Sequence, residues 1–375
     1  MSRKMRMPAP LPIPSDDRRL HRFRDRKYNP RPFGRENFVI KVGIVGATGY
    51  GGREILRLLG IHPQARVTKL TSTSAVGEGL DTQLPGFRGL TRLIFETFDA
   101  EALASSCDVV FVGVPGSEST RMVAALRAAG VRTIDIGPDF RLKDTKVFAQ
   151  YYKTEHEAPQ LLAESVYGFP PFYREALKTA QLVAGPGCYP ISVIVPLRPI
   201  VEATSLDCPP VIDAVSGTSG AGRSLKESFH FAEMNENVWA YKVAAHQHIP
   251  EIEQELLHKT MVQFTPHVGP YTRGILSTIT IRPSNPIDLD TCFARYAKEP
   301  FVRVLGEGKL PELNHVRASN FCDFGWVTDK RTGNIVIVSA VDNLMGGTAG
   351  IAIQCMNLMF GLDETAGLSV GGMSV

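Results

Sequence analysis

Hydrophobic residues in the first half of the chain form strand-like runs that alternate with helix-like spacings. A continuous apolar run at 39–45 leads into a glycine-rich stretch at 46–52, and apolar residues at helical spacing follow at 53–59. The same two patterns then recur, as strand-like runs at 66–70, 109–114 and 133–136 and as a helical pattern at 118–129. Strands that alternate with helices predict a parallel, doubly wound α/β sheet.

The pattern changes beyond residue 185. Segments rich in β-branched residues lie at 209–216, 263–267, 274–281 and 334–341, and helical spacings lie at 193–200 and 249–258. We therefore expect an α+β region built on a mainly β, mixed sheet. Residues 346–360 have a helical pattern that is apolar on nearly every side, which predicts a buried helix that packs back on the first region.

These two rhythms and a length of 375 residues predict two domains. We expect a coenzyme-binding domain at 38–184 and a catalytic and oligomerisation domain at 185–343. The C-terminal segment 344–375 returns to the first domain in this scheme. No run of about 18 apolar residues occurs, so we expect no membrane-spanning helix and no membrane partner.

The net charge of +3 hides an excess of positive charge in residues 1–37. This segment carries 11 Lys and Arg against 4 Asp and Glu, so the rest of the chain is mildly acidic, at 30 against 34, and we expect no nucleic-acid partner. The segment lacks the apolar content to pack, which predicts a basic, disordered arm. A short basic helix at 18–27 that touches an acidic partner or a neighbouring subunit is the alternative. The acidic residues and the scarcity of serine in residues 1–37 argue against an organelle-targeting peptide.

The stretch 43–52, Gly-Ile-Val-Gly-Ala-Thr-Gly-Tyr-Gly-Gly, has the context of a dinucleotide site, because it follows a strand and opens a helix. Small residues let a pyrophosphate approach the backbone, and the helix N-terminus attracts its charge. We therefore expect a Rossmann-type domain, with a tight strand–helix connection as the alternative for this G-x-x-G-x-x-G spacing. The expected coenzyme contacts are Gly46, Ala47, Thr48, Gly49, Tyr50, Gly51, Ser72, Thr73, Ser74, Pro115 and Asn343.

The end of the second strand indicates which coenzyme binds. An enzyme dedicated to NAD places Asp or Glu there to hold the ribose 2′-hydroxyl. Residues 71–74 read Thr-Ser-Thr-Ser, without an acid. Hydroxyl groups suit a 2′-phosphate, so the sequence favours NADP, although this run has no Arg to pair with that phosphate.

Cys188 is the candidate nucleophile. It follows a Gly-Pro-Gly turn after a strand-like run, and at a helix start the exposed N–H groups and the dipole favour the thiolate. The other five cysteines have no comparable surroundings. All six are scattered, without a C-x-x-C pair, which predicts free thiols, no metal site and a reducing, cytoplasmic location.

Two further motifs complete the candidate site. His246 and His248 precede a helix start, and in an extended segment their side chains point the same way, as base and acid or as base and substrate contact. A structural role is the alternative, and a third ligand for zinc is missing. The loop 216–223 is rich in hydroxyls and ends in Arg, which suits a phosphate or carboxylate unless it is an ordinary surface loop. The expected substrate contacts are Ser216, Gly217, Arg223, Tyr241 and Glu251.

A coenzyme site together with a cysteine nucleophile indicates the reaction class. An alcohol dehydrogenase has no need of a thiol, whereas a carbonyl at the acid oxidation level does. The thiol forms a thioester with an activated acyl group, a hydride reduces the thioester to an aldehyde, and His moves the proton. The anion-binding loop then indicates phosphate as the leaving group.

These motifs, in this order, resemble the N-acetyl-γ-glutamyl-phosphate reductases of the semialdehyde dehydrogenase superfamily, which act in arginine biosynthesis. The resemblance covers about residues 38–370 and includes 42–52, the Asp-Phe-Arg-Leu-Lys-Asp run at 139–144, 185–190 and 241–255. It implies Cys188 as the nucleophile, a catalytic His at 246 or 248, and NADPH on the first domain, completed by Asn343 and the C-terminal helix. It also implies release of N-acetylglutamate 5-semialdehyde and phosphate, and a homodimer or homotetramer formed through the second sheet.

The chain departs from the usual residues of this family at four positions. Gly185 stands where Asn is common, Ile191 where Thr is common and Gly116 where His is common, and an Arg often found near Thr73 is absent. Two alternatives therefore stay open. One is a related N-blocked or carrier-bound glutamyl or aminoadipyl phosphate as substrate. The other is a non-catalytic paralogue that binds a dinucleotide, against which the retained Cys and His residues argue.

Overall fold

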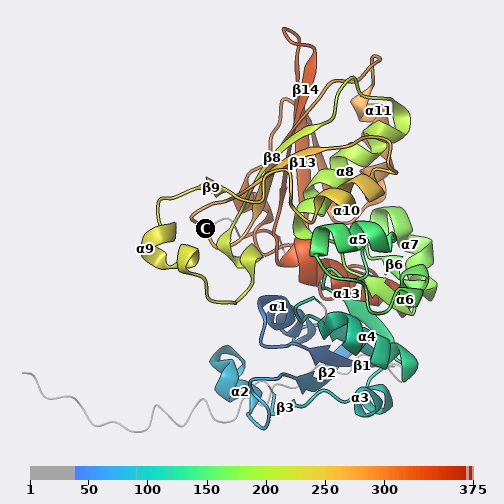
Figure 1. The fold of residues 1–375 in the computed structure, drawn as a ribbon, viewed down its shortest axis with the longest axis vertical. Coiled ribbons are helices and arrows are strands. Elements are labelled where there is room, and N and C mark those ends of the chain that lie inside the picture. Colours follow the sequence, from blue (N-terminus) through green and yellow to red (C-terminus); the bar gives the residue numbers. More distant parts are fainter. Residues whose placement is uncertain (1–38, 90, 117, 369–370, 374–375) are drawn as a thin grey trace, which may run out of the picture. The chain divides into compact units, whose positions relative to one another are not determined.

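The computed structural model describes residues 39–89, 91–116, 118–368 and 371–373, and Figure 1 shows their arrangement around two seven-stranded sheets. The expected arm at 1–37 and the alternative helix at 18–27 lie outside the described residues. Among the described helices, none combines the length and the hydropathy needed to cross a lipid bilayer.

The first sheet is parallel throughout, with the strand order β3-β2-β1-β4-β5-β7-β6. Its strands are β1 (Ile40–Val45), β2 (Ala65–Thr71), β3 (Phe95–Glu96), β4 (Val109–Val112), β5 (Arg132–Asp135), β6 (Val166–Tyr167) and β7 (Leu182–Ala184). The central strands β1 and β4 are almost entirely buried, which explains their continuous apolar sequences. Strand order reverses between β1 and β4, and in such sheets ligands bind at the carboxyl ends of the strands at this point.

Helices cover both faces of the first sheet. On one face, α1 (Tyr50–Leu59) and α7 (Pro170–Thr179) share a core cluster with α13 (Gly350–Met359) from the end of the chain. On the other face, α3 (Ala100–Ser106), α4 (Glu118–Ala128) and α6 (Gln160–Glu164) pack on β4 and β7. The remaining helical elements of this half are α2 (Leu80–Gln83), η2 (Pro85–Phe87) and α5 (Thr145–Tyr152).

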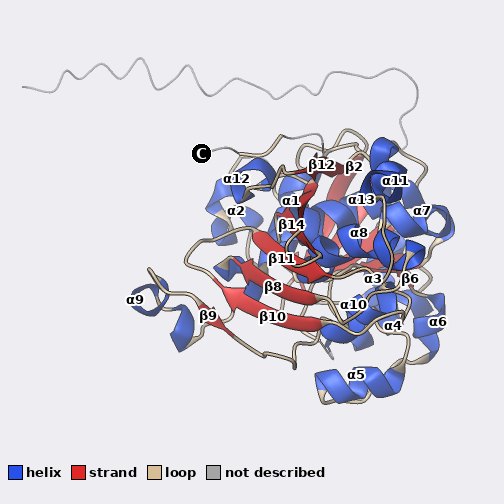
Figure 2. Cartoon of the chain, turned by 90° about the horizontal axis from the view of Figure 1, so that it is seen from above, coloured by secondary structure: helices blue, strands red, loops and turns tan. Residues whose placement is uncertain are grey.

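The second sheet is mixed, with the order β12-β13-β14-β11-β8-β10-β9. Its strands are β8 (Val211–Ser216), β9 (Trp239–Ala240), β10 (Gln263–Val268), β11 (Ile275–Ile281), β12 (Val302–Glu307), β13 (Cys322–Asp329) and β14 (Asn334–Val341). Figure 2 shows helix α8 (Cys188–Ala203) along one face of this sheet, where it contacts β11 and β14. The other helical elements are η3 (Thr218–Ala221), η4 (Glu227–Phe229), α9 (Phe231–Met234), α10 (Ile249–Glu255), α11 (Leu289–Phe293), η5 (Ala294–Lys298), α12 (Leu313–Val316) and η6 (Met345–Ala349).

Burial alternates along β11, as expected of a strand with one covered face. Ile275, Ser277, Ile279 and Ile281 are buried, whereas the residues between them are partly or fully exposed. The same alternation occurs on β8 and in the first half of β14. One face of the second sheet thus packs on α8, and the opposite face retains accessible β-branched and polar side chains within the described chain.

The expected fold class is confirmed, and most expected strands occur within a residue or two of their predicted bounds. The helix expected at 193–200 is the middle of the longer α8, which tolerates Pro196 and Pro199 inside an almost fully buried helix. The helix expected at 346–360 begins with a π-helical turn, η6, before α13 continues. Strands β12 and β13 were not expected, although Cys322, Phe324 and Trp326 do recur at every second position of β13.

Gly46 offers a test of the glycine loop. Its φ is +82°, and an added Cβ would lie 2.4 Å from the carbonyl oxygen of Gly113, whereas Gly130 has a φ of +83° and open space around it. Since both substitutions by Ala carry the same backbone cost, we expect Gly46→Ala to lower the free energy of unfolding by at least about 1 kcal/mol more than Gly130→Ala. Urea unfolding measures the difference, and equal losses would contradict the contact with Gly113.

Candidate active site

Cys188 is the first residue of α8 and lies in the wall of a pocket of about 570 Å³. The structure brings to this pocket most of the residues expected at the catalytic site, namely Cys188, Ser216, Gly217, Tyr241, His246 and His248. It adds residues that the sequence analysis did not select, among them Arg141, Lys226, Trp239 and Thr348. Of these, only Arg141 lies in a motif already noted, the Asp-Phe-Arg-Leu-Lys-Asp run. The residues around it in the sequence do not predict that its side chain is buried.

Two glycines allow other groups to come close to Cys188. At Gly187, an added Cβ would lie 2.7 Å from Nε2 of His248, 2.9 Å from Oε2 of Glu251 and 3.0 Å from Nη1 of Arg141. On the other side, a Cβ at Gly347 would lie 2.8 Å from the Cβ of Cys188. A side chain at either position would therefore displace a part of the site, so glycine is required by close approach rather than by its φ.

Glu251 and Arg141 form a buried ion pair below the pocket. Nη1 of Arg141 lies 3.4 Å from Oε2 of Glu251, while Oε1 of Glu251 accepts hydrogen bonds from the Gly187 N–H at 2.7 Å and from the Tyr167 hydroxyl at 2.8 Å. Glu251 is fully buried and does not line the pocket. Its oxygens bind groups of the protein in this structure, and its expected contact with the substrate stays a prediction.

The remaining donors of Arg141 hold the backbone beside Cys188. Nε donates to the carbonyl of Gly185 at 2.7 Å, and Nη2 donates to that of Ile136 at 3.2 Å. The Gly185 N–H in turn donates to the carbonyl of Asp135 at 2.7 Å. One guanidinium thus joins the ends of β5 and β7 to α10, which sets the position of the turn that precedes the nucleophile.

The acidity of Cys188 reflects two opposing effects. Removal from water raises the pKa of its thiol to about 11, while the positive charge of Arg141 and a hydrogen bond from the Tyr189 N–H lower it. The expectation that the helix start favours the thiolate is thus not met in this structure, because desolvation outweighs the favourable charges. A thiol of this pKa needs a neighbouring base to take its proton before it attacks a carbonyl.

His246 and His248 lie on turns rather than on the expected extended segment. Lys242 and Ala244 have φ values of 44° and 54°, and His248 has a right-handed helical conformation. The extended geometry was therefore wrong, but both rings still line the Cys188 pocket, with their centroids 4.6 Å apart. Strain at positive φ in the turn is the local cost of this arrangement.

Both histidines are held in the neutral form. Burial, aided by the charge of Lys242, lowers the pKa of His246 to about 4, and burial with His246 and Arg141 lowers the pKa of His248 well below its usual value. Both rings are therefore neutral at pH 7.

Hydrogen bonds assign the ring proton of each histidine. Nδ1 of His246 accepts the backbone N–H of His248 at 3.1 Å, so its proton is on Nε2. Nε2 of His248 lies 3.5 Å from Nη1 of Arg141, a group that only donates, so the proton of His248 is on Nδ1. That Nδ1 is buried and has no hydrogen-bond partner among the described residues.

The loop 216–223 divides between two sites. Ser216 and Gly217 line the Cys188 pocket, but Arg223, which was expected beside them, is exposed and lines a different pocket next to the glycine loop. The amide of Asn343 ties this loop to β11, since Nδ2 donates to Oγ of Ser219 at 2.9 Å and Oδ1 accepts the Gly274 N–H at 2.8 Å. In this arrangement Asn343 supports the loop, and its expected contact with a nicotinamide stays a prediction.

The second pocket, of about 200 Å³, lies at the carboxyl ends of β1, β2 and β4. Its lining includes expected coenzyme contacts, namely Gly46, Thr48, Gly49, Ser72, Thr73 and Pro115. Gly49 caps α1 without a side-chain hydrogen bond, so N–H groups of the first helical turn stay available to an anion. Gly46 and Gly52 let the loop pack closely on its own backbone, since a Cβ at either position would clash with the backbone of Gly113 or of Ala47.

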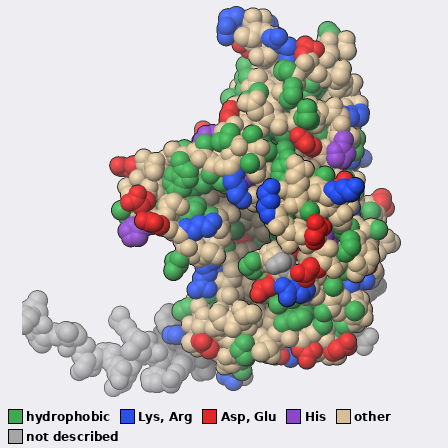
Figure 3. All heavy atoms as spheres, in the orientation of Figure 1, with side chains coloured by type: hydrophobic (Ala, Val, Ile, Leu, Met, Phe, Trp, Pro, Cys, Tyr) green, Lys and Arg blue, Asp and Glu red, His purple; other side chains and the backbone are tan. Residues whose placement is uncertain are grey.

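Four other expected coenzyme contacts lie beside this pocket rather than in its wall. Ala47 is buried in the core, and Gly51 packs against Ile136, 2.7 Å from where its Cβ would be. The N–H of Ser74 donates to the Ser72 hydroxyl at 3.2 Å. Tyr50 lines a larger neighbouring pocket of about 980 Å³, and Figure 3 shows this side of the molecule hollowed, with Lys and Arg side chains around the hollow.

Comparison with protein families identifies two matching domains. Residues 41–180 match the semialdehyde dehydrogenase NAD-binding domain, and residues 188–343 match the semialdehyde dehydrogenase dimerisation domain. An N-acetyl-gamma-glutamyl-phosphate reductase of Desulforudis audaxviator is 45% identical over 344 residues, which are 89% of this chain and 99% of that protein. A reductase of the same name from Pelotomaculum thermopropionicum is 44% identical over 345 residues, 89% of this chain and 99% of that protein.

Solved structures with a similar fold are aspartate semialdehyde dehydrogenases. One, the Vibrio cholerae enzyme II complexed with ASA, has a TM-score of 0.67 at 17% identity and covers 86% of this chain and 98% of that one. Another, from Candida albicans with NADP, has a TM-score of 0.66 at 16% identity, with the same coverage. At this identity the likeness concerns the fold alone.

The opposite charges of Arg141 and Glu251 lead to a test of their effect on Cys188. Arg141 lowers the pKa of the thiol and Glu251 raises it. We therefore expect Arg141→Met to slow alkylation of Cys188 at pH 8 by roughly ten-fold, and Glu251→Gln to accelerate it. Mass spectrometry after iodoacetamide treatment measures the rate, and the exposed Cys208 serves as the internal control.

The opposite changes in alkylation rate that we expect for the two variants distinguish an effect of charge from damage to the fold. Loss of either partner leaves a buried charge unpaired and costs about 3–5 kcal/mol of stability, so both variants are weakened alike. A change of alkylation rate in the same direction for both variants would contradict the electrostatic account.

Proposed function

We propose that this chain, which belongs to the semialdehyde dehydrogenase family and to its N-acetyl-γ-glutamyl-phosphate reductases, reduces N-acetyl-γ-glutamyl phosphate with NADPH. The products are N-acetylglutamate 5-semialdehyde, NADP⁺ and phosphate, and the step belongs to arginine biosynthesis. One observation carries the proposal: a half-buried thiol at a helix start shares a pocket with two neutral imidazoles. The high identity to reductases of this name, over nearly their full length, supports the choice of substrate.

The first half of the reaction forms a thioester on Cys188. A neutral imidazole takes the thiol proton, Sγ forms a bond to the acyl carbon, and the bond between that carbon and the phosphate oxygen breaks. The departing phosphate takes the proton. His248 is the better base on position, because its ring lies against Gly187, the residue before the nucleophile. His246 packs behind it against Tyr189, Tyr241 and Phe264 and supports its ring.

The second half releases the aldehyde. The coenzyme, when bound, supplies a hydride to the thioester carbon. The carbon–sulfur bond then breaks, Sγ leaves as a thiolate, and the imidazole returns a proton from solvent to it. Arg141 stabilises the thiolate at this stage, since its charge is the largest influence that lowers the pKa of Cys188.

The residues of the smaller pocket support NADP as the coenzyme. Ser72 and Thr73 line it at the end of β2, where an NAD enzyme carries an acid. The acidic residue in the lining of this pocket is Glu118, which belongs to α4 and not to the end of β2. Hydroxyl groups at this position suit a 2′-phosphate, and residues 38–184 with 344–375 form the coenzyme-binding domain in this proposal.

The four departures from the family pattern do not favour another acyl substrate. Gly185, Ile191 and Gly116 are absent from the lining of the Cys188 pocket, and Ile191 is buried in the core of the second domain. A Cβ at Gly185 would lie 3.0 Å from the carbonyl of Asp135, so this turn packs without a side chain. Thr73 lines the pocket proposed for the coenzyme, and Ile191 lines a small internal cavity apart from Cys188.

We also propose that residues 185–343 form a homodimer or homotetramer through the accessible face of the second sheet. That face carries Val215, Leu276, Thr278 and Val338, which the described helices leave partly or fully exposed. In a monomer the apolar residues of this face would be in contact with water, whereas association of two copies would bury them. Light scattering after size-exclusion chromatography measures the mass, and a species of 41.0 kDa would contradict self-association.

Replacement of the nucleophile tests the reaction. The reverse assay supplies N-acetylglutamate 5-semialdehyde, NADP⁺ and phosphate and follows the absorbance of NADPH. We expect turnover in the wild type and a fall of at least roughly 10³-fold in Cys188→Ser, because the hydroxyl cannot replace the thiol in this pocket. Cys208→Ser, which removes an exposed thiol, is the matched control and keeps its activity.

Two further measurements with the same assay distinguish the related substrate and the non-catalytic paralogue from the proposed function. Activity only with an aminoadipate semialdehyde in place of the glutamate semialdehyde would transfer the function to the related substrate. Absence of turnover with every aldehyde, with retained NADP⁺ binding, would support the non-catalytic paralogue. Turnover that persists in Cys188→Ser would rule out the thioester.

A further inference from the structure

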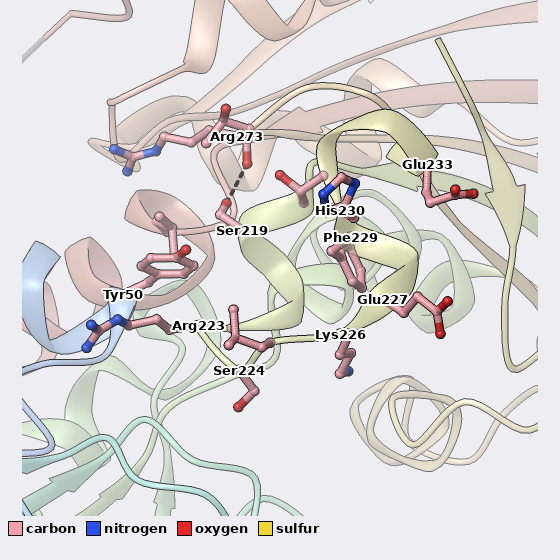
Figure 4. A pocket seen from close by; sticks show the side chains of 15 residues that line it. Tyr50, Ser219, Arg223, Ser224, Lys226, Glu227, Phe229, His230, Glu233 and Arg273 are labelled. Atoms are coloured by element: carbon pink, nitrogen blue, oxygen red, sulfur yellow. Dashed lines mark hydrogen bonds between the residues drawn. The ribbon is translucent and has the colours of Figure 1, made fainter. Parts of the chain in front are cut away.

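Arg223 belongs to the catalytic half of the chain but lies at the coenzyme pocket. It follows η3 and lines both the pocket of about 200 Å³ at the glycine loop and the adjoining one of about 980 Å³. Figure 4 shows its guanidinium beside Tyr50, the first residue of α1, and pointing away from Lys226 and Glu227. The side chain thus extends from the second domain toward the first.

The guanidinium of Arg223 has no partner within the described ranges. It takes part in no ion pair and no hydrogen bond there, although its position in the pocket wall brings it close to Gly46, Thr48 and Ser72. The acid that lines the same pocket, Glu118, does not pair with it. An arginine with five free donors at a pocket wall is suited to bind an anion with more than one oxygen.

A second arginine adds positive charge to the same place. Nε of Arg53 donates to the carbonyl of Thr48 at 2.9 Å, which holds this side chain on the glycine loop. Burial and the nearby charge of Arg223 both lower the pKa of Arg53, so the two cations repel each other. A bound anion between the two would relieve this repulsion.

The end of β2 lacks the cation that a phosphate there requires. Residues 71–74 offer only hydroxyl and backbone groups, and Ser72 and Ser74 bind each other. Arg223 is the arginine that lines the pocket containing Ser72 and Thr73. Its position therefore supplies, from a distant part of the sequence, the charge that β2 does not provide.

We propose that Arg223 binds a phosphate of the dinucleotide coenzyme and thereby joins the catalytic domain to the coenzyme. This inference rests on the proposed function for the identity of the coenzyme. Two phosphates have the chemistry that Arg223 recognises, the 2′-phosphate of NADP and the pyrophosphate common to NADP and NAD. The loop that carries Arg223 also carries Ser219, whose hydroxyl accepts a hydrogen bond from Asn343, and both Ser219 and Arg223 line the adjoining pocket.

Calorimetric titration of the full chain with NADP⁺ and, separately, with NAD⁺ tests the role of Arg223 without any acyl substrate. We expect Arg223→Ala to weaken the binding of NADP⁺ by roughly 10-fold to 100-fold. Arg331→Ala is the matched control, because Arg331 is an exposed arginine on the β13–β14 turn, and its side chain is 83% accessible. Arg223→Lys keeps the charge and is expected to recover part of the affinity.

The two coenzymes distinguish the two phosphates. A loss of affinity for NADP⁺ alone supports contact with the 2′-phosphate, and an equal loss for both supports contact with the pyrophosphate. Unchanged affinity for both, with wild-type binding intact, overturns the role of Arg223 and leaves the proposed function untouched. A wild-type chain that binds neither coenzyme overturns both.

Discussion

The buried pair of Arg141 and Glu251 is the interaction around which the site is built. Each charge alone would be costly when buried, and the pair is tolerated because each carboxylate oxygen and each guanidinium nitrogen has at least one partner. Those partners are the backbone at Gly185 and Gly187 and the hydroxyl of Tyr167. The hydrogen bonds that offset the cost of burying the two charges therefore also hold the turn before Cys188 in place.

Burial acts on both kinds of reactive group in this site. It raises the pKa of the Cys188 thiol and lowers the pKa of the His248 ring, so both are uncharged at pH 7, while the charge of Arg141 opposes the rise for the thiol. In the proposed mechanism, the thiolate released at the end of the reaction meets the guanidinium of Arg141, whose charge stabilises it. The glycines at 187 and 347 permit this density of groups around one sulfur atom.

The sequence predicted well what depends on local pattern. Continuous apolar runs revealed the buried strands β1 and β4, and the loop after β1 revealed the coenzyme cradle. Cys188 could be found because a turn and a helix start are readable from glycine and proline. Arg141 could not, since its importance comes from burial between β5, β7 and α10, which are distant in sequence. The sequence also could not show that Arg223 lines the pocket at the glycine loop instead of the Cys188 pocket, because the direction of an exposed loop is set by tertiary contacts.

The position of α13 at the end of the chain affects the order in which the first domain can fold during synthesis. Residues of α13, such as Ile353 and Met356, complete the core that α1 and β1 begin, so the two ends of the folded region share one hydrophobic cluster. During synthesis the first sheet is finished at Ala184, but its cover leaves the ribosome only after Met359. At about 5–20 residues per second this interval lasts roughly 10–35 s. Throughout that time one apolar face of the first sheet lacks α13, so α1 and α7, the helices that share this cluster with α13, are the ones available to cover it.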